Sequence, residues 1–433
     1  MPKGPRTLRI AFGAETLTHY GGVSLLHRFL TRIGFKHAMA QDIRLMQRHN
    51  RYSVGEMFLA VLYPMIRGLE RIEPAHLLKQ NGVFQYLTGL RSYPNPTTVR
   101  RCLLRVAPTA LPTLRRRHDR RLARMTVRPH PPSRLICDVD STVLVLYGKQ
   151  EHARIGSNPI KRGRPSDHPL RCFEGLSQDF WHGALRPGDA HTASGTRELL
   201  TACFAKIPTG VRAVMIRADK GVYDHTLIEW LEAQKTGCVI VARLPAPITR
   251  TLAQLRYVSP SRGIEVAEFP YQPIRWPHPS RFVVIRRPQP DDPTDQLTLF
   301  KLGRYHDQVL VTNLPLQPLN LWRFSNDRAG VELLIKQLNG EYALGSSPTR
   351  HFFANETDFH LLLLTDNLIN WFKRLCLPQE CQNATLQTLR HKILLMPAQL
   401  RRVGNRPSLA LPASGPGEAA WRHALHQIER LKL

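Results

Sequence analysis

The run Leu135-Ile-Cys-Asp-Val-Asp-Ser-Thr-Val-Leu-Val-Leu146 decides the fold of this chain, because it sets two acids inside an apolar, β-branched stretch. That composition predicts a β-strand. Side chains alternate along a strand, so Asp138 and Asp140 share one face while Cys137 and Val139 turn to the other. A strand this apolar is expected to be central and covered, where ionised groups are costly unless a cation or hydrogen-bond donors meet them.

The composition of the chain favours a large, folded, nucleic-acid-binding protein. With 433 residues, the chain is expected to form two or three structural units. Lys and Arg number 61 against 33 Asp and Glu, a net charge of +28. Such a field concentrates polyanions, chiefly nucleic acid, and an anionic membrane is a weaker candidate because no basic amphipathic anchor stands out. The hydrophobic content of 42% indicates that a folded protein carries this charge.

The cysteines and the apolar segments indicate a cytoplasmic protein. The seven cysteines are scattered without a CxxC pair, which argues against a zinc site or a disulfide framework and predicts buried free thiols in a reducing compartment. The N-terminus lacks the apolar segment of an export signal, and the longest aliphatic block, Leu361 to Leu364, is far too short to cross a bilayer. We therefore expect neither export nor a membrane span.

Residues 1–130 are predicted to be helical after a short irregular start. Apolar positions recur with helical spacing in residues 23–33 and 54–69. Residues 97–105, which follow Pro-Asn-Pro, predict a short basic helix capped by threonine. Such a helix can lie against DNA, although many surface helices have the same composition.

The densest positive charge lies in residues 115–124 and includes Arg115, Arg116 and Arg117. These residues could form an ordinary solvated face of a helix. Adjacent like charges repel one another unless an anion is near, however. We therefore favour a contact with DNA phosphates for this cluster.

A second basic cluster lies in residues 148–166, which the Gly, Pro and basic residues predict to be a loop. Its cations are Lys161, Arg162 and Arg164. Taken alone, they fit a minor-groove contact, a localisation signal or a mobile basic turn. DNA binding is the interpretation that suits the charge of the whole chain.

The rest of the chain predicts a mixed α/β core interrupted by an insertion. Residues 131–245 alternate apolar strands with two helices, and two acids fall near strand ends, where open α/β sheets build sites. Residues 246–305 read as a β-rich insertion without a convincing helix, and residues 306–375 resume the core with a strand and two helices. Residues 376–433 predict a hairpin around Gly404-Asn405 and a final amphipathic helix.

Three acids are candidates for chemistry: Asp140 and Asp219 near strand ends, and Glu332 on a later helix. Arg328, Glu332 and Lys336 fall four residues apart on one helix face, which taken alone most simply describes a surface ladder of ion pairs. Carboxylates are, however, the ligands that Mg²⁺ and Mn²⁺ prefer. Two such ions about 3.5–4 Å apart can promote phosphodiester chemistry by activating the attacking oxygen and stabilising the leaving one.

Several motifs in a fixed order carry a resemblance to a known family. The motifs are Asp138-Val-Asp-Ser-Thr142, Gly148-Lys-Gln-Glu151, residues 158–165, His168-Pro-Leu170, Arg217-Ala-Asp-Lys-Gly221, Arg328-Ala-Gly-Val-Glu-Leu-Leu-Ile-Lys336 and the hairpin of residues 390–402. With this ordered set, the chain resembles the DDE transposases of bacterial insertion sequences, in the branch whose catalytic domain has a ribonuclease-H-like fold. The resemblance covers most of the chain and implies an α/β fold with a ribonuclease-H-like mixed sheet, flanking helices, a β-rich insertion and an N-terminal helical domain for DNA binding or assembly.

The resemblance implies that Asp140, Asp219 and Glu332 are the catalytic, metal-binding triad. Asp140 is preferred because the family's first acid usually has a Ser or Thr two residues later, here Thr142; Asp138 stays open as the alternative. The signature around the third acid has an arginine four residues before it, matched by Arg328. Two further residues of the signature are less well matched. Ser325 stands where the family commonly has a tyrosine. The position of the family's lysine is Asn339 here, although a closer-spaced variant of the signature matches Lys336.

The implied reaction is metal-assisted hydrolysis at the ends of the element, followed by attack of the freed 3′-hydroxyl on target DNA. The implied cofactor is Mg²⁺ or Mn²⁺, with two ions, and the partners are terminal inverted repeats, target DNA and a second copy of the chain in the complex. The enzyme would act on the bacterial nucleoid. The alternatives are a structure-specific nuclease of the same fold and a DNA-binding relative without activity. The cations expected to contact DNA are Arg115, Arg116, Arg117, Lys161, Arg162, Arg164, Arg328 and Lys336.

Overall fold

The chain folds into two compact units in the computed structural model, which describes residues 16–43, 51–128, 130–158, 161–274, 276–288, 305–412 and 417–432. The helical unit comprises Met1–Thr113, Glu341–Pro348 and Leu368–Leu433. The sheet unit comprises Leu114–Gly340 and Thr349–Asn367. The irregular start expected for the chain lies outside the described residues.

The bounds of the strands and helices in the described residues are as follows. The strands are β1 (Leu17–Thr18), β2 (Arg134–Ser141), β3 (Leu144–Val145), β4 (Arg154–Ile155), β5 (Pro165–Asp167), β6 (Leu170–Glu174), β7 (Phe180–Ala184), β8 (Ala213–Ala218), β9 (Gly237–Val241), β10 (Val258–Ser261), β11 (Ile264–Tyr271), β12 (Ser280–Pro288), β13 (Tyr305–Thr312), β14 (Ala398–Val403) and β15 (Arg406–Ala410). The helices are α1 (Val23–Arg32), α2 (Phe35–Asp42), α3 (Val54–Arg67), α4 (His76–Lys79), α5 (Gly82–Leu87), α6 (Pro96–Thr126), α7 (Thr196–Phe204), α8 (His225–Ala233), α9 (Ala246–Gln254), α10 (Pro318–Asn326), α11 (Ala329–Glu341), α12 (Phe352–Cys376), α13 (Gln379–Gln382), α14 (Leu386–Leu389) and α15 (Glu418–Arg430), with a 3-10 turn at Glu73–Ala75 and a π turn at Arg390–Leu394.

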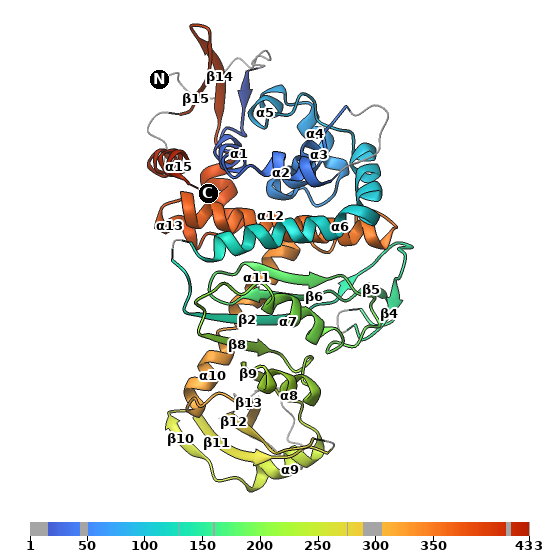
Figure 1. Ribbon diagram of the computed structural model, residues 1–433, viewed down its shortest axis with the longest axis vertical. Helices are drawn as coiled ribbons and strands as arrows, with labels where there is room; N and C mark the ends of the chain where they lie inside the picture. The colour runs from blue at the N-terminus through green and yellow to red at the C-terminus, as the bar shows by residue number, and fades with distance from the viewer. Residues whose placement is uncertain are drawn as a thin grey trace, which may run out of the picture. The chain divides into compact units, whose positions relative to one another are not determined.

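The sheet unit is built on nine strands in the order β10-β11-β12-β13-β9-β8-β2-β6-β7 (Figure 1). β2 pairs antiparallel with β6 and parallel with β8, while β6 and β7 are antiparallel and β8 and β9 are parallel. Three antiparallel strands followed by two strands parallel to the first are the arrangement expected of a ribonuclease-H-like sheet. The predicted fold class is thereby confirmed.

β2 is the central strand that the sequence predicted. All its residues from Leu135 to Asp140 are buried. Cys137 of β2 and Cys172 of β6 lie close to Cys203 of α7, and each of the three thiols is nearly inaccessible. The strand is shorter than expected because it ends at Ser141, after which the chain enters a small sheet in the order β3-β5-β4. The loop expected for residues 148–166 therefore contains strand β4 and the start of β5.

The β-rich insertion extends the main sheet. β11 and β12 pair antiparallel, and β12 pairs antiparallel with β13 over eight register positions. Their apolar residues form one core with β9 and α10, which includes Val239, Val283 and Leu321. The expectation that this segment holds no helix was wrong, because α9 occupies its first nine residues and buries Ile248 and Leu252. Residues 289–304 of the expected insertion lie outside the described part of the chain.

Helix α6 differs most from its prediction. The short helix expected at residues 97–105 is the start of a 31-residue helix that begins at Pro96 and runs through the basic cluster to Thr126. Proline is well suited to a first helical position, because its missing N–H would have no partner there. Thr97 thus lies inside the first turn, and threonine capping of this helix was wrong.

In the helical unit, the helices expected at residues 23–33 and 54–69 are confirmed as α1 and α3. α3 begins with a capping box in which Ser53 and Glu56 satisfy each other's backbone N–H groups. The C-terminal hairpin is confirmed as β14 and β15 around Gly404, whose φ of +60° suits glycine. All seven cysteines are buried free thiols, as predicted. Among the described residues, no helix is long and apolar enough to cross a membrane.

Candidate active site

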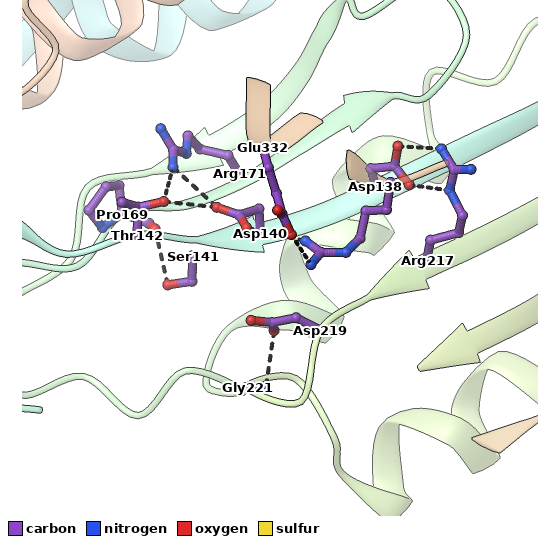
Figure 2. A network of polar contacts seen from close by, with 11 residues as sticks. Asp138, Asp140, Ser141, Thr142, Pro169, Arg171, Arg217, Asp219, Gly221 and Glu332 are labelled. Atoms are coloured by element: carbon purple, nitrogen blue, oxygen red, sulfur yellow. Dashed lines mark hydrogen bonds and ion pairs between the residues drawn. The ribbon is translucent and has the colours of Figure 1, made fainter. Parts of the chain in front are cut away.

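The three acids singled out by the sequence come together in the sheet unit. Asp140 lies near the end of β2, Asp219 directly follows β8, and Glu332 lies in the first turn of α11. Because β2 and β8 are parallel neighbours, their C-terminal ends meet at one edge of the sheet. Figure 2 shows Glu332 reaching toward the space between Asp140 and Asp219. The fold thus joins segments that are far apart along the chain.

A single arginine links these acids. Arg328 donates from Nη1 to Oδ1 of Asp140 at 3.4 Å and from Nη2 to Oε1 of Glu332 at 2.7 Å. The ion pair with Glu332 is the predicted contact between residues four apart. Lys336 is exposed, and the ladder stops before it, since no ion pair joins it to Glu332 in the described part of the chain. Arg328 therefore also contacts Asp140, which the sequence did not predict for it.

Asp138 is engaged elsewhere. Arg217, its register partner on β8, donates to it from Nε at 2.6 Å and from Nη2 at 2.7 Å. Asp138 is 0% exposed, and burial raises its pKa while Arg217 opposes that rise. A Cβ on Gly175 would come within 2.6 Å of Nη2 of Arg217 and 2.8 Å of Oδ2 of Asp138, so only glycine leaves room for the pair. Both oxygens of Asp138 are occupied, which favours Asp140 as the first acid of a metal site.

Asp140 accepts hydrogen bonds from two further residues, Thr142 and Arg171, on the same oxygen. Thr142 donates from Oγ1 to Oδ2 of Asp140 at 2.9 Å. Arg171, the register partner of Asp140 on β6, donates from Nη2 to the same Oδ2 at 3.3 Å and to Oγ1 of Thr142 at 2.6 Å (Figure 2). The threonine that identified Asp140 in the sequence is therefore in direct contact with it.

Asp219 is held by the turn that follows β8. Its Oδ1 accepts from the N–H of Gly221 at 2.9 Å. Burial raises the pKa of Asp219, and the guanidinium of Arg328 acts against that rise. A Cβ on Gly221 would meet Thr192 at 2.6 Å, so the turn also depends on glycine. The N–H of Gly221 thus fixes the carboxylate of Asp219 through Oδ1, and Oδ2 is not used by this hydrogen bond.

The sequence analysis did not assign two residues beside the acids to the site: Arg171, which it missed, and His168, which it named only as part of a motif. Arg171 could have been found only by knowing the β2–β6 register, which puts it opposite Asp140. Nδ1 of His168 hydrogen-bonds the carbonyl of Ala190 at 3.0 Å. Burial lowers the pKa of His168, while Asp140 and Asp219 both act to raise it, which puts this ring close to both acids.

The donor set suits a hard divalent cation. Three carboxylates from three elements offer the oxygen ligands that Mg²⁺ and Mn²⁺ prefer. In the described part of the chain, no three His, Cys, Asp or Glu side chains are already spaced to hold a metal ion. At this site, Arg328 forms ion pairs with both Asp140 and Glu332. The residues fit an ion chemically, and Arg328 would have to leave at least one acid to admit it.

The arginines of the basic clusters differ in their contacts and exposure. Arg115 forms an ion pair with Glu356 at 2.7 Å and a hydrogen bond with His360 at 3.0 Å, so it holds α6 and α12 together within the sheet unit. Arg116 is exposed and Arg117 is half-buried. Arg162 is exposed as well.

Lys161 and Arg164 gather around Tyr147. Lys161 donates from Nζ to the hydroxyl of Tyr147 at 2.8 Å, and Arg164 lies 5.8 Å from the centre of its ring. Tyr147 is itself exposed. The two cations are therefore held together beside one exposed aromatic ring.

A ribonuclease-H-like sheet with carboxylates at the ends of two parallel strands and on a following helix defines a class of metal-dependent phosphodiester enzymes. The family model described as transposase DDE domain group 1 matches residues 2–433. The chain belongs to this family, whose members catalyse DNA cleavage and strand transfer in transposition and generally depend on divalent metal ions. A solved structure titled as a piggyBac transposase synaptic complex with hairpin DNA matches with a TM-score of 0.47 and 13% identity, over 87% of this chain and 80% of that one. None of the curated proteins matches the sequence.

Proposed function

We propose that Asp140, Asp219 and Glu332 are the catalytic triad of this transposase. The observation that carries the proposal is the convergence of these carboxylates from β2, the β8 turn and α11, with Arg328 balancing their charge. Asp138 is excluded from the triad in this proposal because Arg217 occupies both its oxygens. Because the family generally depends on divalent ions, the proposed role of the three acids is to bind these ions.

The ions proposed are two Mg²⁺ or Mn²⁺, bound by the three acids. When bound, such ions supply the activation of the attacking oxygen and the stabilisation of the leaving oxygen. The chain's own residues keep the acids in place: Thr142 fixes Asp140, and the N–H of Gly221 fixes Asp219. Arg328 would release at least one acid and become available to a DNA phosphate, the contact expected for it from the sequence.

The proposed substrates are the terminal inverted repeats of an insertion sequence and a target DNA. The net charge of +28 supports a polyanionic substrate. Lys161 and Arg164 support a DNA contact through the face they share with Tyr147. Arg116, Arg117, Arg162 and Lys336 are proposed as further contacts; Arg115 contributes through its position in α6, since its guanidinium already pairs with Glu356.

The remaining expectations belong to the same proposal. Residues 1–130 would supply DNA binding and assembly, residues 131–245 and 306–375 the catalytic core, residues 246–305 an insertion beside the DNA, and residues 376–433 the C-terminal hairpin and helix. Because two ends must be joined to one target, a homodimer in the DNA complex is proposed. The site of action would be the nucleoid in the bacterial cytoplasm.

The test uses DNA ends taken from the inverted repeats that flank the coding region. The full chain is expected to nick them only with Mg²⁺ or Mn²⁺, and to join pre-cut ends to a plasmid. Asp219→Asn should abolish both reactions while end binding, measured by a mobility shift, persists. Cleavage without joining would indicate the nuclease alternative, and tight binding without any product the inactive relative. Undiminished cleavage by Asp219→Asn would end the proposal.

A further inference from the structure

Two arginines flank β2, one on each neighbouring strand. They differ in how many of their guanidinium nitrogens make hydrogen bonds. Arg217 uses all three nitrogens: Nε and Nη2 on Asp138, and Nη1 on the carbonyl of Phe324 at 2.9 Å. Arg171 is 0% exposed, yet only its Nη2 makes hydrogen bonds. Its Nε and Nη1 are buried and have no hydrogen-bond partner in the described part of the chain.

A buried guanidinium with unpaired N–H donors does not stabilise a fold well. Buried donors without partners cost free energy, and native structures keep such groups where another role requires them. A buried ion pair can often be replaced by apolar side chains without loss of stability. The presence of Arg171 therefore needs a reason other than the folding of β6 onto β2.

The contacts of Arg171 supply that reason. Its Nη2 reaches both Oγ1 of Thr142 and Oδ2 of Asp140, and Thr142 donates to the same Oδ2. Two donors thus fix one oxygen of the carboxylate. Among the described residues, the other oxygen, Oδ1, has only the long contact of 3.4 Å with Arg328.

We propose that Arg171 is a positioning residue for the metal site, acting through Thr142 on Asp140. It holds Oδ2 against β6 so that Oδ1 is the oxygen presented to a divalent cation. This inference rests on the proposed function, because it assumes that Asp140 is a metal ligand. Groups that orient a ligand in this way typically contribute about 10–100-fold to metal affinity.

The direction in which metal affinity changes when Arg171 is removed distinguishes a positioning role from a purely electrostatic effect. Arg171 is a cation near the site, so its charge alone opposes the binding of another cation, and removing it should then tighten metal binding. If Arg171 positions Asp140, its removal should weaken metal binding instead. The two accounts predict opposite results for the same variant.

The experiment measures the binding of Mn²⁺ alone to the full chain by electron paramagnetic resonance, together with thermal unfolding. Arg171→Met is expected to bind Mn²⁺ about 10–100-fold more weakly. Its unfolding midpoint should stay close to that of the parent chain, because Asp140 keeps its contacts with Thr142 and Arg328. Thr142→Val should shift Mn²⁺ affinity in the same direction. The double variant should be no weaker than the weaker single variant, because both residues act on one oxygen.

Matched controls separate this inference from the proposed function. Arg217→Met, on the other side of β2, should lower the unfolding midpoint by leaving Asp138 buried and unpaired. Asp140→Asn should lose Mn²⁺ affinity; if it does not, the proposed function itself fails. If Asp140→Asn loses affinity while Arg171→Met and Thr142→Val bind Mn²⁺ as tightly as the parent or more tightly, only the positioning role of Arg171 is overturned.

Discussion

Asp138 and Arg217 stand opposite each other on the parallel strands β2 and β8 and join through two hydrogen bonds of 2.6 and 2.7 Å. Two residues further along β2, Asp140 has a different surrounding, shared with Thr142 and Arg171. One face of a single strand thus carries two acids with separate tasks. The first fastens the sheet, and the second is available to the site at the sheet edge.

The first prediction concerns the Asp138 pair. Arg217→Met leaves the carboxylate of Asp138 buried and uncompensated, and should lower the free energy of unfolding by about 3–5 kcal/mol. Chemical denaturation monitored by circular dichroism measures this loss. The control is the double variant Asp138→Leu with Arg217→Met, which removes both charges and should recover most of the stability. A single variant as stable as the parent chain would refute the structural role of the pair.

The contrast between these two acids shows where sequence reasoning reaches its limit. Strand alternation placed Asp138 and Asp140 on one face, and Thr142 favoured Asp140, both from local sequence. Which arginine meets which acid depends on the β2–β6 and β2–β8 registers. Those registers are set by packing between segments that are far apart in the chain, so no local pattern contains them.

The third acid shows the same limit at a helix. The sequence analysis placed Arg328, Glu332 and Lys336 on one helix, whereas α10 ends at Asn326 and α11 begins at Ala329. Glu332 therefore lies in a first turn, where the helix dipole stabilises a carboxylate. Arg328 lies in the short break between the two helices and contacts both Asp140 and Glu332.

The second prediction concerns Arg328. Its guanidinium competes with a divalent cation for Asp140 and Glu332, so Arg328→Gln should bind Mn²⁺ at least about threefold more tightly. Titration of the full chain with Mn²⁺, followed by electron paramagnetic resonance, gives the affinity. Lys336→Gln is a suitable control, because Lys336 is a cation on the helix of Glu332 without an ion pair to Glu332 in the described structure. Weaker Mn²⁺ binding by Arg328→Gln would contradict the competition.

The third prediction concerns the thiols. All seven cysteines are buried, and burial raises the pKa of Cys102 to about 11 and that of Cys238 to about 12. Thiolates are the reactive form, so an aromatic disulfide reagent at pH 8 should modify none of them within minutes in the native chain. The same reagent should count all seven in guanidinium chloride. Rapid modification of the native chain would show that the core opens around these residues.

The last prediction concerns the pH dependence of stability and rests on Asp167. This residue of β5 is buried, its Oδ1 has no hydrogen-bond partner in the described residues, and burial raises its pKa to about 7. The corresponding pKa in an unfolded chain is about 3.9. The native state therefore holds the proton more tightly than the unfolded state does, so stability is highest below about pH 4 with respect to this group and falls as the pH rises toward 7.

Asp167→Asn tests this sign, because asparagine keeps the shape of the side chain and removes its ionisation. Between pH 4 and 7 the parent chain should lose stability relative to the variant by roughly 2–4 kcal/mol, with no further divergence above pH 7. Urea unfolding at pH 4.5, 6 and 8 measures the difference. Taking the difference between the two chains cancels the contribution of other buried acids such as Asp358, whose pKa burial also raises to about 7. A difference that stays constant with pH would mean that Asp167 ionises in the folded chain as it does in water.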